Sequence, residues 1–294
     1  MNDASQASPP TAATDVLAGQ PVRVIERDGV HYTLLGTAHV SPASVAAVEA
    51  AIGSGQFDAV AVELDPQRLA SMEDPDAMAK MALGEVIRKG RVALFAANLG
   101  LAAYQRRLAE QLGIEPGAEL KRAVVLARAN DLPVQLIDRE VGLTFRRASR
   151  RLGLWGKVKL MTGIGAGLLS SEEVGEAEIE KLKQGDMLEA SFGDFASQSP
   201  ALYDTVIAER DRYMAARLRQ ETQLARSADG SPPRQVLAVV GAGHLAGLAN
   251  HLEHDDADPA TTCQALADVP SGRRIPWFTL AILAVIIGGI AYGF

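Results

Sequence analysis

Apolar positions follow two different periods along this chain, and together they predict strands separated by helices. Two of the runs are almost uninterrupted, which is typical of strands buried on both faces. The first two runs are separated by Asp28-Gly29, a dipeptide typical of two-residue hairpin turns. The predicted strands are residues 22–26, 30–35, 57–64, 133–137 and 235–240.

Apolar residues at helical spacing fill most of the remaining chain. Between the fourth and fifth strands lies a long helical region, about residues 141–226, which begins with an arginine-rich helix. The resulting order predicts an α/β fold whose mixed sheet carries a large helical insertion. The other predicted helices are residues 44–52, a helix opened by Asp65-Pro66, 92–112, 117–129 and 245–252.

The two ends of the chain differ in character. Residues 1–20 are rich in Ala, Ser, Thr and Pro and are expected to be a disordered tail. Residues 255–274 read as a linker, and residues 275–294 carry no charge over a length that crosses a bilayer. Arg273-Arg274 precede this apolar stretch. By the positive-inside rule, we expect a single C-terminal transmembrane helix in the cell membrane, with the preceding domain facing the cytoplasm.

Composition narrows the classes of function. A net charge of −7 argues against a nucleic-acid-binding protein. The single cysteine, Cys263, excludes a disulfide framework and a cysteine-rich zinc site. A metal would therefore need ligands from the five histidines and the carboxylates. Oligomeric state is left open, with a homo-oligomer among the options.

Four polar residues stand where predicted strands end. Gly36-Thr37-Ala38-His39 and Gly241-Ala242-Gly243-His244 repeat the same Gly-x-x-His turn, while Glu63 and Asp138 end two other strands. In open α/β sheets the carboxyl ends of parallel strands line the ligand site. Two imidazoles and a carboxylate are a standard ligand set for a catalytic divalent metal. The alternative is that each histidine is only a helix cap or a packed ring.

Charged residues near these turns are further candidates. Arg68 and Arg139 are suited to binding a carboxylate or an oxyanion, although Arg68 and Glu63 also suit a structural ion pair. Glu119 is a candidate on a predicted helix, with an exposed helix face as the alternative. Glu209-Arg210-Asp211 would ordinarily be a solvent-exposed charge cluster; Glu209 and Arg210 are retained as candidates.

A competing motif begins at the second turn. Gly241-Ala242-Gly243, with Gly247, resembles a dinucleotide-binding fingerprint. A true fingerprint needs a further strand and an acidic residue about twenty positions on, where this chain instead has the predicted linker.

Taken together, these motifs resemble the TraB family. The segments that carry the resemblance lie within residues 22–254 and are Gly36-Thr37-Ala38-His39-Val40-Ser41, Val62-Glu63-Leu64-Asp65 with Arg68, Asp138-Arg139, Glu209-Arg210-Asp211 and Gly241-Ala242-Gly243-His244-Leu245. The family looks related to the Tiki metalloproteases and, more distantly, to the erythromycin-esterase and ChaN-like fold. A TraB-like domain is therefore expected over residues 21–254.

The resemblance implies a divalent metal, manganese or cobalt in preference to zinc, held by His39, Glu63 and His244. It implies hydrolysis of a peptide, or suppression of a peptide signal. In the expected mechanism Glu63 is a ligand or the general base, Arg68 and Arg139 orient the substrate, and Asp138 positions a ligand imidazole. Two alternatives remain: a protein that sequesters a peptide or small ligand without turnover, and a metal-free esterase with His39 as base.

Overall fold

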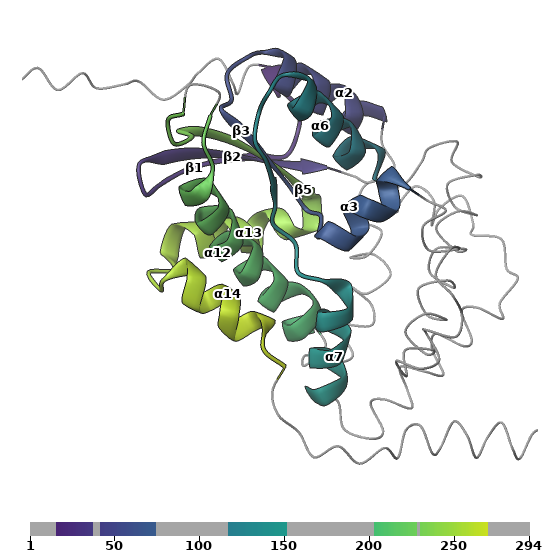
Figure 1. The fold of residues 1–294 in the computed structure, drawn as a ribbon, viewed down its shortest axis with the longest axis vertical. Helices are drawn as coiled ribbons and strands as arrows, with labels where there is room; N and C mark the ends of the chain where they lie inside the picture. Colours follow the sequence, from purple (N-terminus) through teal and green to yellow (C-terminus); the bar gives the residue numbers. More distant parts are fainter. Residues whose placement is uncertain (1–15, 38–41, 75–116, 152–202, 228–229, 270–294) are drawn as a thin grey trace, which may run out of the picture.

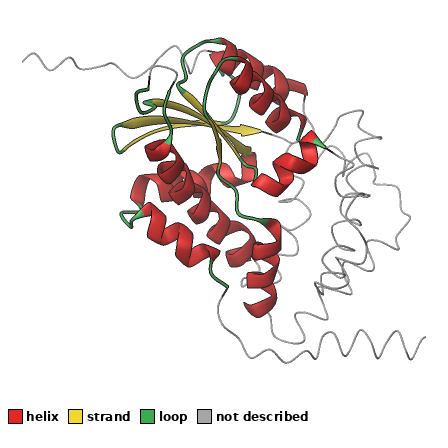
Figure 2. Cartoon of the chain, viewed as in Figure 1, coloured by secondary structure: helices red, strands yellow, loops and turns green. Residues whose placement is uncertain are grey.

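The computed structural model describes residues 16–37, 42–74, 117–151, 203–227 and 230–269. Within these residues a five-stranded sheet in the order β1-β2-β5-β3-β4 lies between helices on both of its faces (Figures 1 and 2). The strands are β1 (Val22–Arg27), β2 (Val30–Thr37), β3 (Ala59–Val62), β4 (Val134–Leu136) and β5 (Gln235–Gly241). The mixed α/β sheet expected from the sequence is confirmed.

The first two strands form the expected hairpin. Asp28 and Gly29 both have positive φ, 55° and 74°, as a two-residue turn that matches the twist of its strands requires. β1 and β2 are antiparallel, with Val22 opposite Leu35. This hairpin makes β1 the antiparallel edge of a sheet whose other strands are parallel.

β5 is the central strand, and it arrives last along the chain. It pairs with β2 on one side and β3 on the other, both in parallel. The register sets Thr37 opposite Gly241, so the two strands that lead into the Gly-x-x-His turns are direct neighbours. All four parallel strands end at the same edge of the sheet.

The helices form two layers with separate cores. On one face α2 and α6 pack against Leu35, Val60 and Val239; on the other α12 and α13 pack against Leu34, Ala61 and Val240. The helices are α2 (Pro42–Gly53), α3 (Pro66–Glu73), α6 (Ala118–Ala129), α7 (Val141–Arg151), α12 (Glu209–Leu224), α13 (Leu245–His254) and α14 (Pro259–Ala267).

Helix α14 occupies much of the segment expected to be a linker. The side chain of Asp258 accepts a hydrogen bond from the backbone N–H of Thr261, and Pro259 takes the first helical position. Both features start helices. Cys263 and Leu266 are buried, and α14 packs against α12. The folded domain therefore extends past residue 254.

Several expectations fall on residues outside the described ranges. These are the tail before residue 16, His39, the helix at 92–112, the middle of the helical insertion at 152–202, and the apolar stretch at 275–294. Within the described residues, no helix has both the length and the apolar character needed to cross a membrane.

Candidate functional site

A cluster of buried charged side chains lies at the carboxyl ends of the parallel strands. Glu63 directly follows β3, Asp138 comes two residues after β4, and His244 comes three residues after β5. α12 brings two further residues to the same place, Arg210 and Asp211, through the contacts below. The strand-end cluster is defined here as Glu63, Asp138, Arg210, Asp211 and His244, all of them less than 10% exposed.

Arg210 lies at the centre of the strand-end cluster. Its Nη2 atom donates to Glu63 Oε1 at 2.7 Å and to Asp138 Oδ2 at 3.0 Å. Its Nε atom donates to Asp138 Oδ1 at 3.1 Å, and its Nη1 atom lies 3.1 Å from Nε2 of His244. One guanidinium thus makes charge-assisted hydrogen bonds to two buried carboxylates that follow different strands.

His244 is held from its other ring nitrogen by Asp211. Nδ1 of His244 lies 2.5 Å from Oδ1 of Asp211. Because a carboxylate can only accept, we assign the proton to Nδ1, which leaves the lone pair of Nε2 facing Arg210. Nε2 also lies 3.5 Å from Oε1 of Glu63. A carboxylate behind a histidine in this way is the usual support of a metal-bound imidazole.

Opposing effects set the protonation of this pair. Burial by itself would lower the pKa of His244, but the carboxylates of Glu63 and Asp211 outweigh it, so the pKa lies above its ordinary value. Burial also raises the pKa of Asp211, although the hydrogen bond from His244 acts against it.

Arg68 connects the strand-end cluster to solvent. Asp65 caps α3 by accepting from the backbone N–H groups of Gln67 and Arg68, which fixes the start of this helix. The Nη1 atom of Arg68 then lies 3.5 Å from Oδ2 of Asp138. Its side chain is 35% exposed, against 1% for Asp138. Arg68 is therefore placed to contact a molecule bound at this edge of the sheet. The carboxylate of Glu63 pairs with Arg210 and not with Arg68.

The expected metal ligands can be tested in part. Oε1 of Glu63 and Nε2 of His244 approach each other, while the third expected ligand, His39, lies outside the described residues. Among the residues that the structure does describe, no group of three or more His, Cys, Asp or Glu is arranged to hold a metal. The donor types fit a divalent cation, and Arg210 already makes cationic contacts with both atoms. A bound metal would compete with this guanidinium for them.

Two other candidates form a separate network centred on Glu209. Its carboxylate accepts from Arg139 Nη1 at 3.0 Å and from Arg147 Nε at 2.8 Å, and it also pairs with Arg151. Arg139 further donates to Thr144 and to a backbone carbonyl of the π-helical turn Asp204–Ala208. All three guanidinium nitrogens of Arg139 thus donate hydrogen bonds within the protein, and these bonds link Arg139 to α7 and α12.

Glu209 provides a prediction on pH. Burial alone would raise its pKa, but hydrogen bonds from Arg147 and Arg139 outweigh burial and lower the pKa below its ordinary 4.5. A lowered pKa means that this carboxylate stabilises the fold above about pH 4.5 and that the contribution is lost as the pH falls further. Glu209→Gln should therefore lower the free energy of unfolding at neutral pH, and its difference from the native protein should shrink in acid.

Urea unfolding between pH 3 and pH 7 measures this difference. Glu73→Gln is the matched control, because Glu73 pairs with Arg128 on the surface with a side chain that is 48% exposed. A difference for Glu209→Gln that is constant across this pH range would contradict the assignment.

Glu119 is buried in the first turn of α6. The exposed helix face considered for it is therefore wrong. Its helix covers the opposite face of the sheet from α12 and Arg210. Glu209, Arg210 and Asp211 are also buried, so the exposed-cluster reading of that run is wrong as well.

Asp211 is the member of the strand-end cluster that was not among the candidates from the sequence. The signal that points to it is Gly247, one turn beyond His244. A Cβ atom at Gly247 would lie 2.0 Å from Oδ2 of Asp211, so the carboxylate fits only against a residue without a side chain. This contact gives Gly247 a role other than nucleotide binding. After α13 the described chain also continues into α14, where a dinucleotide fingerprint would require a strand.

Gly247→Ala should displace Asp211 and free the ring of His244. We expect a loss of about 1–3 kcal/mol in the free energy of unfolding from overpacking. The affinity of the proposed site for its metal should also fall about 10- to 100-fold, which is the usual effect of losing a carboxylate that supports a metal-binding histidine. Gly53→Ala is the control, because no atom lies within 4 Å of the added Cβ. Equal unfolding curves for the two variants would contradict the close contact.

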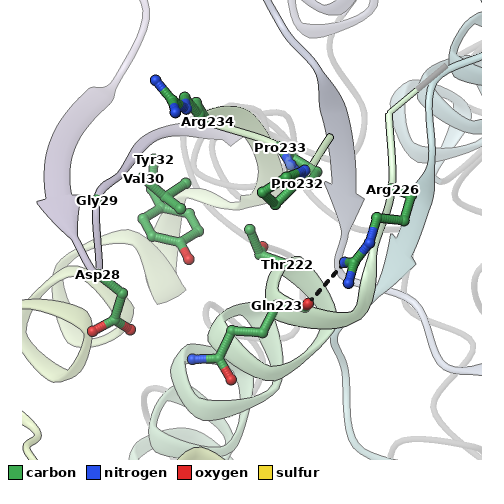
Figure 3. A pocket seen from close by; sticks show the side chains of 10 residues that line it. All are labelled: Asp28, Gly29, Val30, Tyr32, Thr222, Gln223, Arg226, Pro232, Pro233 and Arg234. Atoms are coloured by element: carbon green, nitrogen blue, oxygen red, sulfur yellow. Dashed lines mark hydrogen bonds between the residues drawn. The ribbon is translucent and has the colours of Figure 1, made fainter. Parts of the chain in front are cut away.

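A pocket of about 480 Å³ lies at the opposite edge of the sheet (Figure 3). It is formed by the β1–β2 turn, the end of α12 and the segment before β5. Figure 3 shows Tyr32 and Thr222 among its walls, with Arg226 and Arg234 around them. None of its lining residues belongs to the strand-end cluster.

Comparison with known proteins agrees with the resemblance. The model of the TraB/PrgY/gumN family matches residues 21–261. An uncharacterized protein of Methanocaldococcus jannaschii is 34% identical over 223 residues, which are 75% of this chain and 53% of the archaeal protein. TraB domain-containing proteins of Bos taurus and Homo sapiens are 32% and 30% identical, each over 92% of this chain and 74% of their own length. The chain thus spans about half the length of its archaeal relative, and it belongs to the TraB/PrgY/gumN family.

Proposed function

We propose that the strand-end cluster is the active site of a divalent-metal-dependent hydrolase that acts on peptides. One observation carries the proposal: Nε2 of His244 and Oε1 of Glu63 lie 3.5 Å apart at the carboxyl edge of the sheet, with the imidazole held from behind by Asp211. Burying charged side chains costs free energy, so a purely structural core would not require this group. Membership of the TraB/PrgY/gumN family also supports the proposal, because the metal site was expected from the resemblance to the TraB family.

His39, Glu63 and His244 would hold the ion, with manganese or cobalt preferred. When bound, such an ion polarises a scissile carbonyl and lowers the pKa of a bound water. The protein's own residues do the remaining work. Asp211 keeps the proton of His244 on Nδ1, and Arg68, being half-exposed, orients the carboxylate or carbonyl of a peptide. If Glu63 is not a ligand, it serves as the general base.

We further propose that the domain is tethered to the cell membrane and faces the cytoplasm. The support is in the sequence, where residues 275–294 carry no charge and Arg273-Arg274 precede them. The peptide substrate would then be met at the cytoplasmic surface of the membrane.

A second function has its own observation. Arg210 contacts both Glu63 and His244, so a cation that belongs to the protein already holds the two expected ligands in place. A protein that binds a peptide through Arg68 and sequesters it without cleavage would need nothing more. Intact peptide recovered from a tight complex, as seen by mass spectrometry, would favour sequestration.

Peptide cleavage with and without manganese tests the main proposal. We expect activity that depends on the metal and is lost in His39→Ala and in His244→Ala. His254→Ala is the matched control. His254 is the last residue of α13, the helix that begins directly after His244, and its side chain is exposed. Cleavage that survives both chelation and the two substitutions would dispose of the metal mechanism, and ester cleavage that survives chelation would favour the esterase alternative.

A further inference from the structure

Helix α7 has one face packed into the domain and one basic face on the surface. Arg147 and Ala148 are buried against the domain, whereas Arg146, Ser149 and Arg150 are exposed. The helix contains four arginines and no acidic residue, in a chain whose net charge is −7. Phe145 is only partly buried beside the exposed arginines. An apolar ring flanked by arginines is typical of helices at a membrane surface.

The end of α14 is held against α7. Arg150 donates to the carbonyl of Val269 at 3.3 Å, and Arg147 donates to the carbonyl of Asp268. Arg139 reaches the carbonyl of Leu266 at 3.4 Å. Leu266 belongs to the last turn of α14, and Asp268 and Val269 follow the helix, so these arginines lie at the negative end of its dipole. Figure 1 shows the end of α7 close to the end of α14.

This contact limits how far α7 lies from the expected membrane. Val269 touches Arg150, and the uncharged stretch begins at Ile275, six residues later. Six extended residues span at most about 20 Å. If residues 275–294 enter a bilayer, the contact between Arg150 and Val269 lies within that distance of the point where the chain enters it.

We propose that the exposed face of α7, formed by Phe145, Arg146, Ser149 and Arg150, contacts anionic lipid headgroups. This inference rests on the proposed tether and not on the proposed hydrolase. Basic residues beside a membrane span attract the anionic cytoplasmic leaflet, whereas the acidic remainder of the chain is repelled by it. Nearby acidic groups reduce the positive charge of this face without cancelling it. Asp204 is paired with Arg151, while Glu140 and Asp268 are exposed at the margins of the face.

Fluorescence quenching on the whole chain tests this proposal. Ser149→Cys carries an attached dye in the exposed face, and the native Cys263 is buried, with its thiol pKa raised to about 11 by burial, so it should not react. The protein is reconstituted into vesicles of phosphatidylcholine alone or mixed with phosphatidylserine, each with a quencher on the headgroups. We expect stronger quenching in the phosphatidylserine vesicles and its loss at high salt.

Arg146→Gln/Arg150→Gln should reduce the surface-associated fraction. Each basic residue near an anionic surface contributes about fivefold, so the ratio of associated to free α7 should fall about 25-fold. Arg226→Gln/Arg234→Gln is the charge-matched control, because both residues are exposed at the opposite edge of the sheet. Equal quenching in the two lipids, or no effect of the α7 substitutions, would overturn the proposal. Co-flotation of the protein with phosphatidylcholine vesicles is measured separately, so a failed tether and a failed lipid contact give different results.

Discussion

Arg210→Ala should lower the free energy of unfolding by about 3–5 kcal/mol, the cost of removing one partner of a buried ion pair. Arg210 is the cation that both Glu63 and Asp138 contact at 3.0 Å or less, and both carboxylates are buried. Without it Glu63 loses the cation at 2.7 Å, and Asp138 keeps the more distant Arg68, whose Nη1 atom lies 3.5 Å away. Chemical denaturation at neutral pH measures the loss.

Arg217→Ala is the matched control for this variant. Arg217 lies on the same helix and pairs with Glu221 one turn on, but its side chain is 35% exposed. Such a pair is worth less than about 1 kcal/mol. If both variants lose the same amount, Arg210 does not hold the strand ends together.

Asp211→Ala should reduce both metal affinity and peptide cleavage about 10- to 100-fold, the usual effect of removing a carboxylate that supports a metal ligand. The substitution removes the acceptor at Nδ1 of His244, so the ring is free to take the other tautomer. That tautomer would point an N–H group at Arg210 and remove the lone pair from Nε2.

Two measurements check the expected effect of Asp211→Ala, namely manganese titration and cleavage rate. Arg212→Ala is the control, because it is the next residue on α12 and its side chain is 47% exposed. A variant that binds manganese and cleaves peptide within about twofold of the native protein would rule out a supporting role for Asp211.

Local sequence was enough to predict most of the sheet. Asp28-Gly29 specifies a hairpin by its own backbone preference, and the apolar run of β5 specifies a strand buried on both faces. The repeated Gly-x-x-His motif also predicted that β2 and β5 end side by side, and the parallel register of these two strands agrees. These features depend on residues close together along the chain.

The partner of the strand ends could not be predicted in this way. Arg210 joins Asp138 across 72 residues, and a run of alternating charges on a helix ordinarily faces solvent. Only packing of α12 on the sheet buries it. Asp211 was missed for the same reason, since its neighbour Gly247 lies on another helix. The start of α14, in contrast, has a local signal, because Asp258-Pro259 is a typical helix start. This segment was nevertheless expected to be a linker.

Equilibrium dialysis of manganese against the native protein and His244→Ala decides whether the strand-end cluster is a metal site. We expect the native chain to bind an ion there and His244→Ala to lose it, while His254→Ala keeps it. Equal binding by native protein and His244→Ala, or no binding by the native protein, would contradict this expectation.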